Sequence, residues 1–307
     1  MAGELDTTAL AALLASPIMG QDLAELLYDP TDLRATLHEV PFSPNLGSTG
    51  VKMGLYQGDD AMASTADTSS VANTALGTGS VTLTVARQSL AYELTSLSAL
   101  SVRDPSFIAR LAALCVRGYV LRLTDMVVAT HSGFTANTAV GVSGVDLTVD
   151  NVYSAMFALQ LANVPGPWFA SIHHQQYNDF QQSLRGELGA VQFRTDTQGV
   201  LRIGSPGFKG SWNNIEFISS DSVPTANGGA DRDGLVYGVR AICYTVAPPA
   251  TQDSMAAASM AARVEGNAVF LELDRTARAA MTAIISHSWV AVSEMEDARG
   301  VRIVTDA

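Results

Sequence analysis

The sequence predicts a mixed fold of the α+β class, and three features of its pattern support this prediction. Residues 104–130 have the apolar spacing of one long helix. Helical and strand-like segments then alternate from residue 146 to residue 246, as they do in α+β and α/β domains. Residues 41–80 are rich in Gly, Ser and Thr and form a polar stretch too long for an ordinary loop. The chain of 307 residues is long enough for one large domain or two intertwined ones.

The N-terminal part of the chain is acidic and carries two short helical patterns. Residues 7–15 suit a helix that Pro17 ends, and residues 21–28 suit a second helix with its leucines on one side. Helices this short are not stable alone, so we expect an arm that docks on a larger body. The first fifty residues hold seven acidic side chains and a single basic one, Arg34.

The polar stretch that follows predicts a long flap. Residues 51–56 and the returning residues 80–86 have the pattern of two paired strands with a tip between them. A loop of this length needs a task of its own, and reaching over a neighbouring subunit would be such a task.

Residues 104–130 form the strongest single element. Asp104 suits an N-cap and Pro105 suits the first helical turn, while residues 131–133 supply the stop. About 26 residues at a rise of about 1.5 Å make a rod of roughly 39 Å, which suits a structural spine. Arg110, Arg117 and Arg122 mark a more polar side. The apolar positions are Phe107, Ile108, Leu111, Leu114, Cys115, Tyr119, Met126 and Val127.

Helices and strands alternate after residue 146. A helix containing Tyr153, Phe157 and Leu161 is predicted first, and the Pro- and Gly-containing residues 163–167 break it. Further helical and strand patterns follow, with a Pro-, Ala- and Met-rich connector at residues 248–262. The predicted helix spans 175–184, and the predicted strands span 168–172, 201–203, 215–218, 234–246, 268–273 and 287–292.

The composition limits the classes of function. With 18 basic and 30 acidic residues, the net charge is −12. Because phosphate contacts supply most of the affinity for nucleic acid, this balance argues against a nucleic-acid reader, though not against a container of nucleic acid. The mean hydropathy of +0.17 indicates either surface buried against other subunits or a very apolar interior. No stretch reaches the roughly 18 to 20 apolar residues of a membrane span.

Motifs of known catalytic sites are missing from the sequence, which has no nucleophile elbow, Walker loop, HExxH or CxxC pattern. We therefore predict a protein that is not an enzyme and has no catalytic, cofactor-binding or metal-ligating residues. Residues 204–210 superficially resemble a phosphate cradle, but Pro206 removes an amide donor and favours a surface loop. Cys115 and Cys243 are expected to be reduced core side chains.

The pair His173–His174, with Asp179 nearby, is the best candidate for a metal or acid–base site. Adjacent residues of a strand point to opposite faces, so the two imidazoles are not expected to bind one ion. We predict a structural role for both. The same role is expected for the other three histidines, which are His38, His131 and His287.

Three further acidic residues, Asp221, Asp231 and Asp233, flank a Gly-rich turn. A loose calcium site is one interpretation of this group. A solvated turn is the other and is favoured, because Asp and Gly are ordinary turn residues.

The order and proportion of these elements resemble the major capsid proteins of tailed bacteriophages, which share the HK97 fold. The resemblance rests on the long helix, on residues 133–145 after it, and on the aromatic strand Trp168-Phe169-Ala170-Ser171-Ile172. It extends over residues 217–224, 234–242 and 284–292. By this resemblance the chain divides into an N-terminal arm (1–45), an E-loop (46–88), a P-domain with its spine helix (89–145), an A-domain (146–262), and a return to the P-domain with a C-terminal strand (263–307).

The resemblance implies a subunit that forms hexamers and pentamers and closes into an icosahedral head shell around double-stranded DNA. It implies no cofactor, no membrane and no sequence-specific DNA binding. The other partners would be a portal and, where needed, scaffold or decoration proteins. The location would be the virion, after assembly in the cytoplasm of a bacterial host. Some relatives link a lysine of the E-loop to an asparagine, for which Lys52 and Asn267 are a conceivable pair here.

Two other functions stay open at this point. An encapsulin, a bacterial compartment of the same fold that holds protein cargo, differs little in its sequence pattern. A small hydrolase or metal enzyme centred on His173, His174 and Asp179 is the alternative from a different class.

Overall fold

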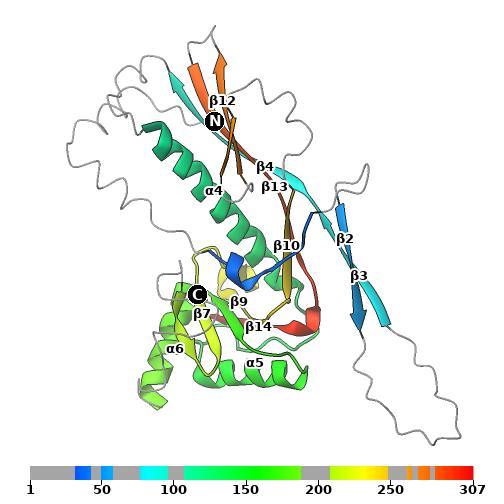
Figure 1. Cartoon of the computed structure of the whole chain (residues 1–307). Coiled ribbons are helices and arrows are strands. Elements are labelled where there is room, and N and C mark those ends of the chain that lie inside the picture. Colours follow the sequence, from blue (N-terminus) through cyan, green and yellow to red (C-terminus); the bar gives the residue numbers. More distant parts are fainter. Residues whose placement is uncertain are drawn as a thin grey trace, which may run out of the picture.

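The computed structural model describes residues 32–42, 50–57, 77–95, 107–187, 208–247, 261–264, 269–276 and 281–306. Within them lie two six-stranded sheets and one two-stranded sheet. Figure 1 shows helix α4 (Phe107–Ala129) running beside the strands of the upper sheet towards the lower sheet, while the two-stranded sheet projects to one side. The helices predicted at 7–15 and 21–28 and the strand predicted at 201–203 lie outside the described residues.

The upper sheet is built around β13 (Met281–Glu294), which pairs antiparallel with three strands. β4 (Ala86–Thr95) follows residues 281–290 of β13. β12 (Val269–Thr276) pairs with its first half and β10 (Ile242–Ala247) with its second half. The sheet is completed by β11 (Ala261–Val264) antiparallel to β12 and by β1 (His38–Glu39) parallel to β10.

Helix α4 packs on the upper sheet, as the spacing of its apolar side chains predicts. At Gly118 the helix approaches β4 so closely that a Cβ atom would lie 2.7 Å from Cδ2 of Leu90. The prediction of one long helix is confirmed over the described residues, and its 23 residues span about 35 Å. The buried cluster between helix and sheet consists of Cys115, Tyr119, Val120, Leu123, Val269, Ile284 and Val290.

The lower sheet has the strand order β14-β9-β5-β7-β6, with β8 beside β9. Only β5 and β7 are parallel to each other. The strand β5 confirms the predicted aromatic strand, and β7 confirms the strand predicted at 215–218. The bounds are β5 (Trp168–Ile172), β6 (Phe208–Trp212), β7 (Ile215–Ser219), β8 (Thr225–Ala226), β9 (Asp231–Gly238) and β14 (Gly300–Asp306).

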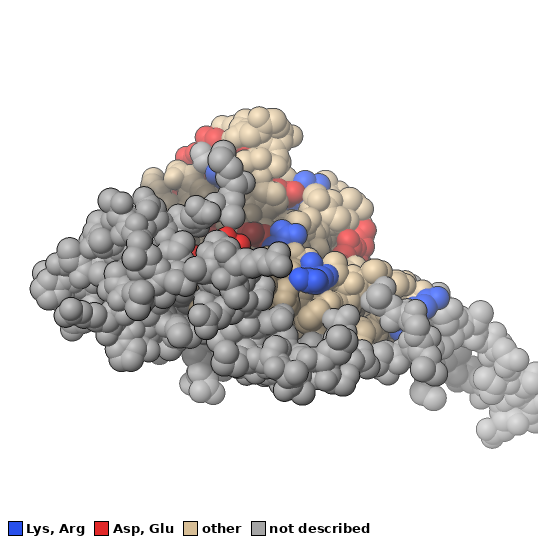
Figure 2. All heavy atoms as spheres, turned by 90° about the horizontal axis from the view of Figure 1, so that it is seen from above, with Lys and Arg blue, Asp and Glu red and all other residues tan. Residues whose placement is uncertain are grey.

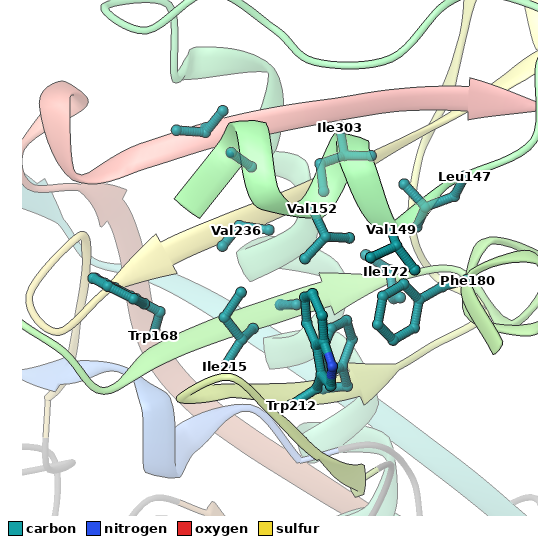
Figure 3. Close-up of a cluster of buried hydrophobic side chains, with 14 of the residues drawn as sticks. Leu147, Val149, Val152, Trp168, Ile172, Phe180, Trp212, Ile215, Val236 and Ile303 are labelled. Carbon is teal, nitrogen blue, oxygen red and sulfur yellow. The ribbon is translucent and has the colours of Figure 1, made fainter. Parts of the chain in front are cut away.

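Both faces of the lower sheet are covered. Helices α5 (Val149–Leu161) and α6 (His174–Glu187) lie over one face and bury the largest core cluster, shown in Figure 3. In this cluster Phe180 stacks on Phe217 at 4.7 Å and meets the ring of Trp212 edge-on at 5.5 Å. The other face packs against the C-terminal end of α4 through Val127 and Val128. Helix α4 therefore contributes to the cores under both sheets.

The two-stranded sheet confirms the predicted hairpin. β2 (Gly50–Gln57) and β3 (Gly77–Thr84) are antiparallel, with Gly50 opposite Thr84 and Gln57 opposite Gly77. Only Val85 separates β3 from β4, so the hairpin is tied directly to the upper sheet. The predicted tip, residues 58–76, lies outside the described residues.

Residues 234–246, predicted as strand-and-turn material, form parts of two strands with a turn between them. β9 belongs to the lower sheet and β10 to the upper one. A tight turn separates them, in which the N–H of Ala241 donates to the carbonyl of Gly238 at 3.2 Å and Arg240 has a φ of 66°. The sequence pattern names no strand at β4 or β6, whereas the C-terminal strand that the resemblance implies is present as β14.

Among the described residues, short turns of 3₁₀ helix occur in loops at η1 (Arg34–Thr36), η2 (His131–Gly133) and η5 (Asp297–Arg299). A further one, η4 (Asn227–Gly229), precedes β9. The predicted stop at residues 131–133 thus takes the form of a 3₁₀ turn directly after α4.

Candidate assembly surfaces

Helix α5 has apolar side chains on two sides. It begins after Thr148, whose hydroxyl accepts a hydrogen bond from the N–H of Asn151 at 3.3 Å. Its outer side carries Tyr153, Phe157 and Leu161 at four-residue spacing, and the last two are 59% and 68% exposed. Exposed apolar side chains lower the free energy of folding or binding only when another surface covers them and removes them from water. The inner side, buried on the lower sheet, consists of Val149, Val152, Ala155 and Leu159.

A groove of about 520 Å³ lies between α5 and residues 136–140. Its lining carries no charge and is made mostly of small residues, among them Ala139 and Ala158. The wall opposite α5 is held in place by Asn137, whose side-chain amide donates to the carbonyls of Ala298 and Gly300, both at 2.9 Å. These two hydrogen bonds tie this wall of the groove to the segment that leads into β14.

The β2–β3 hairpin has one apolar face and one polar face. Val51 and Met53 of β2 share the apolar face with Leu83 of β3. Leu83 is buried, whereas Val51 and Met53 are only partly covered. Lys52 lies on the opposite face and is exposed. A lone two-stranded hairpin is marginally stable in water, so this partly covered face suits a contact with another surface.

The adjacent histidines lie at the junction of β5 and α6 and not within a strand, so the argument from opposite strand faces does not apply to them. β5 ends at Ile172 and α6 begins at His174, which makes His173 the N-cap. Nδ1 of His173 accepts from the N–H of Gln175 at 3.2 Å, and Oε1 of Gln176 accepts from the N–H of His173 at 3.0 Å. This is a capping box with His in the place of Ser or Thr. His173 thus has a structural role, as predicted.

Asp179 does not join the histidines in a site. Nε2 of each imidazole approaches Oδ1 of Asp221 instead, at 3.7 Å and 3.4 Å. Asp179 is buried on α6, where its Oδ1 accepts from Nε2 of Gln175 at 3.2 Å. Burial, together with the nearby carboxylates of Asp146 and Asp306, raises the pKa of Asp179. The three residues of the enzyme alternative therefore do not converge.

The three aspartates of the calcium interpretation also do not converge. Asp231 accepts from the N–H of Gly144 at 2.9 Å and from the side chain of Asn227. Asp233 accepts two hydrogen bonds from the guanidinium of Arg302, at 3.0 Å and 2.8 Å. Both carboxylates are buried, so the favoured interpretation as a solvated turn is wrong for them. Within the described ranges, no group of three His, Cys, Asp or Glu side chains is arranged to hold a metal ion.

Both cysteines and two of the other histidines, His131 and His287, are buried, whereas His38 in β1 is only partly covered. Cys115 and Cys243 are both free thiols in the interior, as predicted. His131 is completely enclosed, with Nδ1 2.9 Å from the carbonyl oxygen of Asp233, and burial lowers its pKa to about 4. Nδ1 of His287 lies 3.2 Å from Oγ of Ser89.

Comparisons with known proteins find similarity only at the level of structure. No protein-family model matches the sequence, and no curated protein matches it. The chain is similar to the head structure of Helicobacter pylori bacteriophage KHP40, with a TM-score of 0.65 at 11% identity over 91% of each chain. It is similar to the capsid of cyanophage P-SCSP1u, with a TM-score of 0.63 at 9% identity over 91% of this chain and 89% of that one.

The chain has the HK97 fold. The fold predicted from the order of the elements is thereby confirmed, together with its α+β class. The SrpI encapsulin of Synechococcus elongatus is similar too, with a TM-score of 0.63 at 14% identity over 92% of this chain and 88% of that one. The HK97 fold by itself therefore does not separate a phage head from an encapsulin. No helix in the described part of the chain is long and apolar enough to cross a membrane.

Within this HK97 fold, the sequence pattern missed the groove and the outer side of α5. A signal was present, because the helix is apolar on two sides and only one side of a surface helix is expected to face its own core. The wall at residues 136–140 has no such signal, since Ala, Asn and Thr are ordinary loop residues. Its position became visible only from the hydrogen bonds of Asn137.

Proposed function

We propose that the chain is the major capsid protein of a tailed phage, whose copies form hexamers and pentamers and close into an icosahedral head shell around double-stranded DNA. The observation that carries the proposal is the match of the whole architecture to phage heads, over 91% of both chains in the case of KHP40. A likeness of this extent supports a subunit whose whole described architecture is that of a shell protein.

The parts of the subunit follow the same proposal. Residues 1–45 form an arm, 46–88 an E-loop with β2 and β3 as its stem, and 89–145 a P-domain with α4 as its spine. Residues 146–262 form an A-domain, and 263–307 return to the P-domain. The strand pairing crosses this division at two places. β10, in the range 146–262, pairs with β13 in the upper sheet. β14, in the range 263–307, pairs with β9 in the lower sheet.

Two features of the described surface support contacts between copies. The hairpin has an apolar face that its own chain covers only in part. The outer side of α5 exposes Phe157 and Leu161 next to an uncharged groove. A lattice of identical subunits would cover such surfaces with neighbouring copies.

The charge of the chain fits an enclosing wall better than a DNA-gripping protein. The net charge is −12. On the face shown in Figure 2, the described basic side chains lie among acidic ones and do not form one patch. A wall with a net negative charge binds phosphates weakly, so packaged DNA would stay free to slide. Portal, scaffold and decoration proteins are the further partners of this proposal, and the virion, assembled in the host cytoplasm, is its location.

The proposal includes that the protein is not an enzyme and uses no metal or cofactor. In the described residues, His173 caps a helix and Asp179 lies with other carboxylates, away from both imidazoles. The substitution His174→Ala is expected to leave assembly unchanged, because His174 is an exposed residue of the first turn of α6.

An encapsulin-type compartment is the second candidate, because the SrpI encapsulin matches with a TM-score of 0.63. The contents of native particles distinguish the two functions. Particles purified from the natural source would be treated with DNase on the outside, opened, and analysed for DNA and for protein. Protected double-stranded DNA of uniform length is expected. Particles that contain an enzyme as cargo and no DNA would contradict the phage proposal and establish the compartment.

A further inference from the structure

The exposed large hydrophobic side chains of the described residues are concentrated in one stretch of the sequence, on α5 and the loop before it. Seven large hydrophobic side chains are classed as exposed, and five of them fall between residues 142 and 161. The other two, Leu121 on α4 and Val239 in the turn after β9, are isolated. The five are Val142, Val145, Tyr153, Phe157 and Leu161. Clustered exposure of this kind marks a contact surface, whereas single exposed side chains are ordinary.

The N-terminal sequence contains a matching element twice. Leu-Ala-Ala-Leu-Leu occurs at residues 10–14, and Leu-Ala-Glu-Leu-Leu occurs at residues 23–27. In a helix, leucines at positions i, i+3 and i+4 share one face, and short amphipathic helices bind grooves through such a face. A nine-residue helix would be about 13 Å long, which fits within the length of about 20 Å that the thirteen residues of α5 offer.

Charge distinguishes the two elements. The groove has an uncharged lining, and the acidic Asp146 and Asp150 are exposed at the beginning of α5. Residues 7–18 carry no charged side chain, whereas Asp22, Glu25 and Asp29 accompany the second element. The second element would be repelled at this surface, and the first would not.

We propose that the groove between α5 and residues 136–140 receives the triplet Leu10, Leu13 and Leu14 from a neighbouring copy of the chain. The proposal rests on the proposed function, because it presumes assembled copies. Seventeen residues lie between Leu14 and Asp32, the first described residue, and a fully extended chain spans up to about 60 Å from one to the other. The segment therefore has the length to reach another subunit. A segment of one copy in a groove of the next makes a heterologous contact, which is the kind that closes rings.

Disulfide trapping in the full-length chain tests this contact. The double variant Leu13→Cys with Leu161→Cys places one thiol in the segment and one at the groove, and a mild oxidant then links thiols whose Cα atoms come within about 7 Å. The native Cys115 and Cys243 stay in place because both are buried. Two matched controls separate specific from random linkage. The first is Leu26→Cys with Leu161→Cys, and the second is Leu13→Cys with Leu121→Cys.

A ladder of linked oligomers is expected on a non-reducing gel for the test variant, with the controls remaining monomeric. Linkage equal to that of the controls would overturn the inference, and so would a disulfide within a single chain. Electron microscopy of the same samples keeps the two proposals apart. Closed particles without linkage would refute the contact and leave the shell function standing. Linkage without closed particles would support the contact and count against the shell function.

Discussion

The buried imidazole of His131 makes the stability of the subunit depend on pH in a defined window. The side chain is completely enclosed at the end of α4, and Nδ1–H donates to the carbonyl of Asp233 on β9. The carboxylate of Asp233 and the guanidinium of Arg302 on β14 are the charged groups facing it. Its pKa falls from 6.5 to about 4 on folding, because burial disfavours the charged form more than Asp233 favours it.

The magnitude follows from this difference in pKa. Each unit of difference between the unfolded and the folded pKa corresponds to about 1.4 kcal/mol. The fall of the pKa from 6.5 to about 4 therefore corresponds to about 3 kcal/mol in the free energy of unfolding. Between these pH values the unfolded chain holds a proton on His131 that the folded chain does not hold. The stabilisation is therefore complete above the unfolded pKa of 6.5, declines as the pH falls, and is lost once the pH passes the folded pKa of about 4.

Urea unfolding of dissociated subunits, followed by the fluorescence of the buried Trp168 and Trp212, measures this dependence. The matched variant is His131→Asn, whose side-chain amide can still donate to the carbonyl of Asp233 but does not titrate. Between pH 7 and pH 4.5 the wild-type chain is expected to lose about 2 to 3 kcal/mol more than the variant. Other groups with shifted pKa values act equally in both chains. Parallel curves for the two proteins would refute the role assigned to His131.

Further predictions concern the packing and the outer surface. Gly300→Ala is expected to lower the free energy of unfolding in urea by about 1 to 3 kcal/mol, because a Cβ would meet the ring of Phe134 at 2.3 Å. In the control Gly186→Ala the new Cβ has open space, so this variant should stabilise α6 by about 0.5 to 1 kcal/mol. Gln176→Ala is expected to lower the free energy of unfolding by about 1 to 3 kcal/mol, since its side-chain amide donates to two carbonyls and one hydroxyl in the interior. An unchanged free energy of unfolding would contradict this role. Phe157→Ser should leave unfolding within about 0.5 kcal/mol but reduce particle yield by sedimentation, and an unchanged yield would contradict a contact there.

The sequence predicted α4 well because its signals agree with one another. Apolar residues repeat at helical spacing, Cys115 and Tyr119 fall on the buried side, and residues 131–133 end the element. The hairpin was predicted for a similar reason, since its two strands have matching patterns and pair in register. Strong local periodicity was sufficient in both cases.

The failures come from places where local pattern and tertiary structure disagree. Residues 234–246 are mostly apolar, with Arg240 and Thr245 as the exceptions, and this pattern does not show that the chain leaves one sheet and enters another at Arg240. The pair His173–His174 follows a buried strand directly, and His is not among the usual N-cap residues. The cap depends on Gln176, whose side chain also donates hydrogen bonds to β9 and β14. The local sequence pattern cannot predict contacts with such distant strands.

The candidate surfaces were the least predictable part. Phe157 and Leu161 look like core residues in the sequence, and only the packing of the opposite side of α5 shows that they face outward. The role of residues 136–140 depends on hydrogen bonds to Ala298 and Gly300, about 160 positions away. A single sequence carries no trace of such pairing.

The most direct test of the proposed function is whether the purified chain assembles into closed shells. Sedimentation velocity and negative-stain electron microscopy of the full-length protein, over a range of concentrations, measure this together. Closed particles of uniform diameter are the predicted result. A compact monomer that persists at high concentration, with residues 46–88 protected from protease inside its own fold, would contradict it.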